Sequence, residues 1–120
     1  MERPPARSFE DLEVWQYAHQ LALSVYRFSD KLPTEEKYGL ISQIRRAAVS
    51  VPSNIAEGFK KRGIRDKIRF YNIAQGSLEE CRYYLILARD LGYENPQDLF
   101  SKVKSVQNLL GSYIGKLDGG

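Results

Sequence analysis

Residues 48–72, AVSVPSNIAEGFKKRGIRDKIRFYN, carry a proline inside an apolar helical pattern and then a burst of positive charge between two glycines. Ile55 and Phe59 keep the helical spacing after Pro52, so the pattern predicts one helix that bends at the proline. Two short helices are the alternative interpretation. The glycines on either side of FKKR predict a turn, and a further helix follows it. The stretch therefore predicts a helical hairpin with a basic tip.

Apolar residues recur at steps of three and four over most of the chain, which predicts four amphipathic helices. The predicted helices span about residues 9–32, 34–60, 64–91 and 96–117. Four such helices joined by short turns predict an all-α fold, an antiparallel up-down-up-down four-helix bundle whose second helix is kinked at Pro52. The residues expected to face the core are Val14, Ala18, Leu21, Val25, Phe28, Leu32, Ile41, Ile44, Ala48, Val51, Ile55, Phe59, Tyr71, Ala74, Leu78, Cys81, Leu85, Ala88, Leu99, Val103, Val106, Leu110, Tyr113 and Leu117.

Capping residues indicate where the predicted helices begin and end. Ser8 and Thr34 precede acidic first turns and are the expected N-caps of the first and second helices. Asn95 is the expected N-cap of the fourth helix, with Pro96 at the first helical position. Gly92 ends the third helix as a C-cap glycine.

A chain of 120 residues is long enough for one compact domain and too short for two. We expect the bundle to occupy residues 9–117. The prolines of MERPPAR exclude regular helix, so residues 1–8 are expected to form a flexible arm. Residues 118–120 are expected to fray.

The composition favours a cytoplasmic protein that does not enter a membrane. A single cysteine cannot form an internal disulfide, and no apolar run approaches the roughly 18 residues of a membrane span. The N-terminal segment MERPPARSFEDL lacks the apolar core of a signal peptide. The net charge of +3 is compatible with nucleic-acid binding without demonstrating it, so the distribution of charge matters more than its sum.

The groups that catalysis needs are sparse in this sequence. His19 is the only histidine and cannot form a metal site by itself. Cys81 falls on the predicted core stripe and is expected to be an inert small hydrophobic residue. Glu79 and Glu80 diverge by about 100° on a helix, so they do not form an acid–base pair. We expect no catalytic residue, no metal site and no cofactor, and therefore no enzyme.

Three segments carry a resemblance to a known family. They are FEDLEVWQYAHQLALSVY at residues 9–26, GLISQIRRAAVSVPSNIAEGFKKR at residues 39–62, and RFYNIAQGSLEECRYYLILARDLGY at residues 69–93. Together they resemble the four helix bundle proteins of the 23S rRNA intervening-sequence family, from about Phe9 to Leu117. The ordered motifs VWQ, QIRRA, NIAEG and GSLEE make the resemblance specific.

The resemblance implies a four-helix bundle that assembles into a ring, typically a homopentamer. Some members of the family are encoded within inserts in large-subunit ribosomal RNA genes. A structurally similar group accompanies reverse transcriptases of diversity-generating retroelements and binds both the transcriptase and nucleic acid. The resemblance therefore gives strong grounds for the fold and weak grounds for the function.

The hairpin tip is the candidate nucleic-acid site. Clustered cations can neutralise phosphates and release counterions, which gives affinity for a nucleic acid of any base sequence. The alternatives are a solvated tip, or ion pairs with Glu10, Asp11 and Glu13 at the start of the first helix. The six candidate binding residues are Lys60, Lys61, Arg62, Arg65, Lys67 and Arg69.

Three residues are assigned to an interface between protomers. Trp15 and Tyr26 widen the apolar stripe of the first helix beyond what one core needs. Arg46 lies opposite the core stripe of the second helix, where a salt bridge to a neighbouring protomer is favoured over a phosphate contact.

Two residues after Pro52 are assigned a structural role. Asn54 is expected to form a polar clasp with the backbone that the proline disturbs, and Glu57 to pair with a basic residue on a neighbouring helix. Gly76 and Ser77 lie inside the third helix, where small residues predict close packing of helices.

These observations lead to two main hypotheses. The first is a non-enzymatic nucleic-acid-binding accessory protein, a ring-shaped homo-oligomer with a basic surface for structured RNA or DNA. The alternative is a scaffold that docks a reverse transcriptase or another protein without affinity for nucleic acid. An assembly with no ligand of its own is a third reading.

Overall fold

The structure is a computed structural model that describes residues 5–119. The predictions of a flexible arm and a frayed C-terminus fall partly on residues 1–4 and Gly120, which lie outside the described residues. No strand occurs in the described part of the chain. In chain order the helices are η1 (Phe9–Asp11), α1 (Glu13–Ser29), η2 (Thr34–Glu36), α2 (Leu40–Lys60), α3 (Ile64–Asp90) and α4 (Gln97–Asp118), where η denotes a 3-10 helix.

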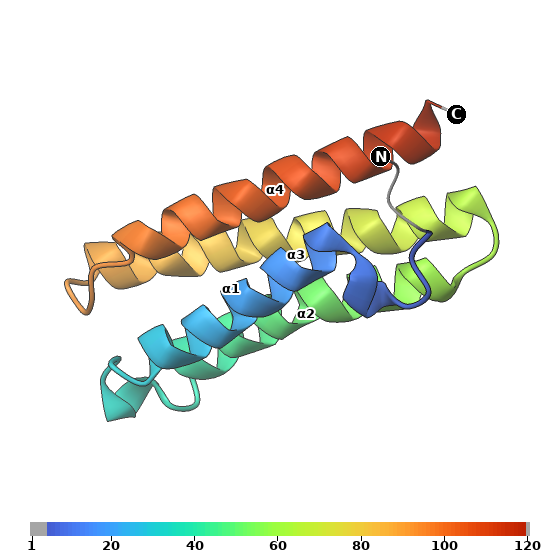
Figure 1. The fold of residues 1–120 in the computed structure, drawn as a ribbon. Helices are drawn as coiled ribbons and strands as arrows, with labels where there is room; N and C mark the ends of the chain where they lie inside the picture. The colour runs from blue at the N-terminus through green and yellow to red at the C-terminus, as the bar shows by residue number, and fades with distance from the viewer. Residues whose placement is uncertain (1–4, 120) are drawn as a thin grey trace.

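The four α-helices pack in a square around a common core (Figure 1). Helix α2 packs against α1 and α3, and α4 packs against α3 and α1, whereas the backbones of the diagonal pairs stay farther apart within residues 5–119. Each helix runs back beside the previous one because the connections are short (Figure 1). The prediction of an all-α, antiparallel four-helix bundle is confirmed.

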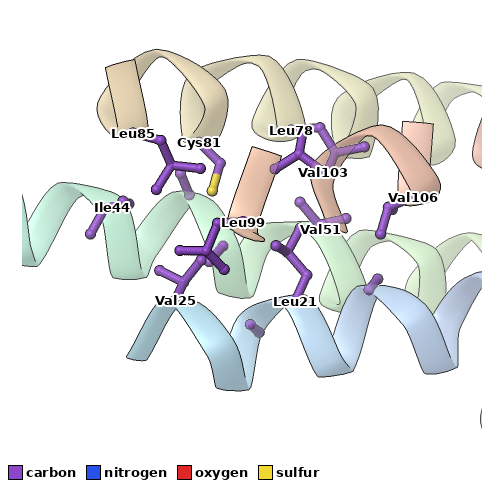
Figure 2. Packing of buried hydrophobic residues seen from close by; sticks show 14 of the residues in the cluster. Leu21, Val25, Ile44, Val51, Leu78, Cys81, Leu85, Leu99, Val103 and Val106 are labelled. Atoms are coloured by element: carbon purple, nitrogen blue, oxygen red, sulfur yellow. The ribbon is translucent and has the colours of Figure 1, made fainter. Parts of the chain in front are cut away.

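The interior of the bundle is built from the apolar stripes that the sequence predicts. Figure 2 shows side chains of all four helices meeting between them, including Leu21 of α1, Val51 of α2, Leu78 of α3 and Val106 of α4. The sulfur of Cys81 also lies in this core (Figure 2). Burial of this apolar surface is the main force that holds the helices together. Four predicted core residues near helix ends are only half-buried: Ile41, Phe59, Tyr113 and Leu117.

The first helix begins later than predicted. Residues 9–11 form the 3-10 turn η1, and Leu12 is extended (φ −78°, ψ 125°) before α1 starts. Ser8 therefore caps η1 and not α1: its hydroxyl accepts a hydrogen bond from the backbone N–H of Glu10 (3.2 Å). The Asp11 carboxylate accepts from the N–H of Ser8 (3.3 Å) in return, so a capping box closes the turn before the chain changes direction.

The first helix also ends earlier than the predicted residue 32. Pro33 disfavours helical backbone at the residue before it, and α1 stops at Ser29. The Ser29 hydroxyl donates to the carbonyl of Tyr26 (2.9 Å), which also accepts from the N–H of Asp30 (3.1 Å). Leu32 is still buried, because the loop folds back over the end of the core.

Thr34 is not the N-cap of the second helix, so this prediction is wrong. Thr34 begins the 3-10 turn η2, and α2 starts only after Gly39. The cap comes from the side chain of Glu36, whose Oε1 accepts from the N–H of Leu40 (3.1 Å). The Oε2 atom of the same carboxylate accepts from the hydroxyl of Tyr93 (3.0 Å). One carboxylate therefore joins the start of α2 to the loop between α3 and α4.

The third helix ends as predicted. Gly92 has a positive φ of 75°, the left-handed conformation that favours glycine. The N–H of Gly92 donates to the carbonyl of Arg89 (3.0 Å), and the N–H of Tyr93 donates to Ala88 (3.0 Å), which is the Schellman pattern. The Asn95 side chain accepts from the N–H of Gln97 (3.1 Å), and α4 begins at Gln97, one residue after the predicted start.

Helix α2 continues without a break through Pro52, so the alternative of two short helices is wrong. The proline has no N–H, and the turn around it is supported by side chains. The Ser53 hydroxyl donates to the carbonyl of Val49 (2.9 Å). A bend at Pro52 stays a prediction.

Helices α2 and α3 pack closely at Gly58. A Cβ atom at this position would lie 2.6 Å from Cε1 of Tyr71 and 3.1 Å from Cβ of Phe70. The space that a side chain would need is therefore filled by the aromatic residues of α3. Gly76, which was expected to allow close packing in the core or at an interface, does not have this role within the chain: a Cβ there would meet no atom within 4 Å.

Replacing Gly58 by alanine should destabilise the protein. The added methyl group collides with the buried ring of Tyr71, and overpacking of this kind costs about 1–3 kcal/mol. Gly76→Ala is the matched control, because it lies in open space and should gain about 0.5–1 kcal/mol of helix propensity. Urea unfolding followed by circular dichroism measures both. Equal stabilities of the two variants would contradict the assigned packing.

Candidate nucleic-acid interface

The connection between α2 and α3 is only three residues long, and it gathers the predicted basic cluster at one end of the bundle. The backbone of Lys61 is extended (φ −68°, ψ 143°), and its N–H donates to the carbonyl of Gly58 (3.2 Å). Lys60, Arg62 and Arg65 are exposed to solvent. The predicted residues therefore lie together, but their side chains have different surroundings.

Lys67 caps the end of α2. Its ammonium group donates to the carbonyl of Phe59 (2.6 Å) and to that of Gly58 (3.3 Å). It also lies 5.4 Å from the centre of the Phe59 ring. Partial burial lowers the pKa of Lys67 below its ordinary value. A cation at this place satisfies carbonyls that the helix leaves open and complements the helix dipole, so Lys67 has a structural role that the sequence did not indicate.

Phe70 organises two further cations. The Lys61 ammonium lies 5.0 Å from the centre of the Phe70 ring, and the Arg69 guanidinium carbon lies 4.9 Å from it. Cation–π contacts of this kind hold side chains that would otherwise be mobile. The half-buried ring therefore presents two positive charges close together at the surface.

The alternative that carboxylates of the same protomer neutralise the cluster receives no support. Within residues 5–119, no ion pair connects Lys60, Lys61, Arg62, Arg65 or Arg69 to a carboxylate. The carboxylate of Asp11, one of the expected partners, instead accepts from the backbone N–H groups of Arg7 (2.9 Å) and Ser8 (3.3 Å). These five cations therefore have no direct carboxylate partner among the described residues.

The structure adds a groove that the sequence analysis missed. Arg65, Arg69 and Asn72 of α3 line a shallow groove together with Asp118 of α4. The signal was present in the sequence, because positions 65, 69 and 72 have the spacing of one helix face. An amide beside two guanidinium groups offers additional hydrogen bonds to a phosphate or a sugar.

The residues assigned to a protomer interface have different surroundings. Trp15 is half-buried within its own chain, stacked on His19 (centroids 5.0 Å apart, planes 7° apart) and packed against Phe9 (4.8 Å). Tyr26 is 43% exposed, and Arg46 is exposed. Tyr26 and Arg46 therefore remain available to a partner, whereas much of the Trp15 surface is already used.

Arg45, the neighbour of Arg46, connects α2 to α1. Its guanidinium donates to the Ser29 hydroxyl (2.6 Å), forms an ion pair with Asp30 (2.7 Å) and lies 4.7 Å from the centre of the Tyr26 ring. The sequence analysis assigned a role to Arg46 and none to Arg45. The structure shows that Arg45 faces the α1 side of α2.

Asn54 takes part in a polar network around Ser50. The Asn54 amide donates to the carbonyl of Ser50 (2.8 Å) and to its hydroxyl (3.0 Å). The buried Ser77 hydroxyl donates to the Ser50 hydroxyl (2.8 Å), so the network joins α2 to α3. Glu57 is exposed and makes no hydrogen bond or ion pair with another described residue, so its expected partner is absent from residues 5–119.

The groups considered for chemistry lie apart from one another. Burial raises the pKa of the Cys81 thiol to about 12, and the side chain lies in the core. No cluster of three histidine, cysteine or carboxylate residues that could hold a metal ion occurs in residues 5–119. None of the described helices is long and apolar enough to span a bilayer.

Lys67→Met should lower the free energy of unfolding by about 1 kcal/mol, because it removes the cation that caps α2 while keeping a similar volume. Arg65→Gln, two residues earlier on α3, is the control; this exposed cation should change stability by less than about 0.5 kcal/mol. Thermal unfolding of both variants measures the difference. A Lys67 variant as stable as the Arg65 variant would contradict the capping role.

Comparison with known proteins agrees with this fold. A solved structure from Bacteroides thetaiotaomicron, described as a protein of unknown function from the S23 ribosomal protein family, is similar to the chain with a TM-score of 0.76 and 26% sequence identity. The similarity covers 84% of this chain and 97% of the other. A search of curated proteins found no match. The family description "23S rRNA-intervening sequence protein" matches residues 10–112, most of the bundle. The chain therefore belongs to the 23S rRNA-intervening sequence protein family, as its resemblance predicted.

Proposed function

We propose that the protein is a non-enzymatic accessory protein that binds structured RNA or DNA through the basic tip of the α2–α3 hairpin. The observation that carries this proposal is the set of cations at the tip that no described carboxylate neutralises. Two of them, Lys61 and Arg69, are held beside one aromatic ring. Charges fixed in this way bind a phosphate with less loss of side-chain entropy than free ones.

The surroundings of the candidate catalytic groups support a role without catalysis. The Cys81 thiol is buried and stays protonated near neutral pH, because its pKa is raised to about 12. His19 is stacked on Trp15. Nucleic-acid binding by phosphate neutralisation needs neither group, nor a cofactor. A cytoplasmic location is part of the same proposal.

Neutralising the tip should weaken binding and flatten its dependence on salt. The test variant carries Lys60→Gln, Lys61→Gln and Arg62→Gln, and the probe is a labelled RNA hairpin titrated at several salt concentrations. Each lost phosphate contact reduces the slope of log K against log [salt] by about 0.9 on a duplex, so the slope should fall by up to about 3.

The matched control also removes two lysines and one arginine, with Arg27→Gln, Lys31→Gln and Lys37→Gln. These exposed residues lie at the end of α1 and in the following loop, far along the chain from the tip. The control should keep the slope of the natural protein. Absence of binding by the natural protein at low salt would overturn the proposed function.

We also propose that the protein acts as a homo-oligomeric ring, a homopentamer in the form that its resemblance suggests. The proposal is supported by apolar side chains of α1 and α2 that other parts of the chain do not fully cover. Leu23, Tyr26 and Val49 are between 39% and 43% exposed. A ring would repeat the basic tip around an axis and multiply its effect on a long nucleic acid.

Light scattering should give a mass about five times the 13.8 kDa of one chain. Tyr26→Glu together with Arg46→Glu should lower that mass, because both side chains are exposed on the proposed interface. Tyr83→Glu is the control, since Tyr83 is 56% exposed on α3. A monomer mass for the natural protein would rule out the ring.

The alternative function is a scaffold for a reverse transcriptase or another protein. The same exposed apolar side chains of α1 and α2 favour it, because such surfaces bind proteins. The salt titration separates the two functions: a scaffold shows no salt-dependent affinity for unrelated nucleic acids.

A further inference from the structure

A groove lies between α1 and α4, which are neighbours in the bundle (Figure 1). Its volume is about 670 Å³, and sites for small molecules usually have about 300–1,000 Å³. The buried Leu21 is among its lining residues, so the groove reaches down to the core. None of its described lining residues belongs to the basic tip. The groove is therefore a separate feature, to which the proposed function assigns no role.

Two stacked rings of α1 line this groove. The centroids of Trp15 and His19 lie 5.0 Å apart and their planes differ by only 7°. Both side chains are half-buried, and Phe9 packs against Trp15 (4.8 Å) and supports the stack. Within residues 5–119, no other aromatic ring contacts His19. A further planar ring can extend this stack into the groove, as nucleic-acid bases do on aromatic side chains.

Amides and hydroxyls around the rings offer hydrogen bonds to a ligand. The Gln20 side chain and the Ser101 hydroxyl form no hydrogen bond with another described residue. The Gln16 amide donates to the carbonyl of Glu10 (2.9 Å), which leaves its side-chain oxygen as an acceptor. The Ser105 hydroxyl, one turn after Ser101, donates to the Ser101 carbonyl (3.1 Å). Groups of these kinds can bind the edge of a base or a sugar hydroxyl.

The charge of the groove comes from α4. Lys102 is the one lysine or arginine among the described lining residues, and none of them is an aspartate or a glutamate. Lys102 is exposed and forms no ion pair with a described residue. A ligand that joins a planar ring to a negative group therefore complements the groove, because the ammonium group attracts the anion while the ring stacks.

We propose that the groove between α1 and α4 binds a nucleotide, with its base stacked on the Trp15–His19 pair and its phosphate at Lys102. The nucleotide can be a free nucleoside monophosphate or an unpaired nucleotide of a longer chain, because both present a base, a sugar and a phosphate. The site goes beyond the proposed function and does not rest on it, since the tip residues play no part in it.

Trp15 is the only tryptophan of the chain, so its fluorescence reports on the groove. The protein is titrated with adenosine monophosphate, with adenosine and with ribose 5-phosphate. Base stacking should quench the emission of Trp15. The monophosphate should bind about tenfold more tightly than adenosine, because the nucleoside lacks the charge that meets Lys102. Ribose 5-phosphate has no base and should leave the emission unchanged.

Lys102→Gln should weaken binding of the monophosphate by about tenfold and leave binding of adenosine unchanged, so the difference between the two ligands should disappear. Lys104→Gln is the matched control. Lys104 is also an exposed lysine of α4, but it lines a separate groove with Arg82 and Arg89. This control should bind both ligands as the natural protein does.

The stacking contact is tested at His19. His19→Ala should weaken the monophosphate and adenosine by the same factor, and His19→Phe, which keeps a ring, should retain binding of both. Calorimetry measures these two variants, because a change at His19 also alters the surroundings of Trp15. Circular dichroism checks that each variant is folded.

A single-stranded tetranucleotide and a fully paired duplex distinguish the two sources of the nucleotide. Quenching by the monophosphate that Lys102→Gln weakens supports a site for free nucleotides. Quenching by the tetranucleotide alone, again weakened by Lys102→Gln, supports a site for an unpaired nucleotide. The duplex should not quench Trp15, because its bases are already stacked on one another.

The proposal is overturned if neither the monophosphate nor the tetranucleotide quenches Trp15, or if Lys102→Gln binds them unchanged. Emission that changes with protein concentration and not with nucleotide also overturns it, and assigns the groove to a contact between copies of the chain. Salt-dependent binding of the RNA hairpin at the tip persists in these cases, so a failure of this site is distinct from a failure of the proposed function.

Discussion

The close packing of α2 against α3 at Gly58 is the contact on which the rest of the molecule depends. The missing side chain lets the ring of Tyr71 lie against the α2 backbone, and the two helices can then be joined by only three residues. Farther along the interface between α2 and α3, the Ser77 hydroxyl donates a hydrogen bond to the Ser50 hydroxyl. With α2 and α3 held in this register, Lys67 reaches the last carbonyls of α2. The hairpin is therefore packed up to its last turn, where Lys67, Lys61 and Arg69 contact other groups of the chain.

The cations of the protein fall into two groups with different tasks. Lys67 and Arg45 point at carbonyls, hydroxyls or carboxylates of their own chain and hold helices together. Arg62 and Arg65 project into solvent and form no ion pair with a described residue. A net charge of only +3 conceals this division, because the electrostatic field at a surface depends on which charges are already paired.

Much of the fold was predictable because its signals are local. The number of helices, their apolar stripes and the glycine C-cap at Gly92 all follow from spacing or from backbone preference within a few residues. The predictions were wrong where a residue distant in the sequence takes part in the local structure. The start of α2 was misplaced because its cap is Glu36, held also by Tyr93 from the α3–α4 loop. Gly76 was misjudged because a glycine in a helix has the same local signature whether it faces a neighbour or solvent.

The sequence by itself determined the family, the four-helix bundle and the place of the basic tip, since helical periodicity and a glycine-bounded turn are properties of neighbouring residues. Only the tertiary structure decided which cations of the tip contact groups of their own chain. It also decided that Arg82 and Arg89 line the same groove as Lys104. The physical reason is the same in both cases. A helical pattern fixes which residues share a face, but the rotation and contact of one helix against another depend on how all four helices fill the core.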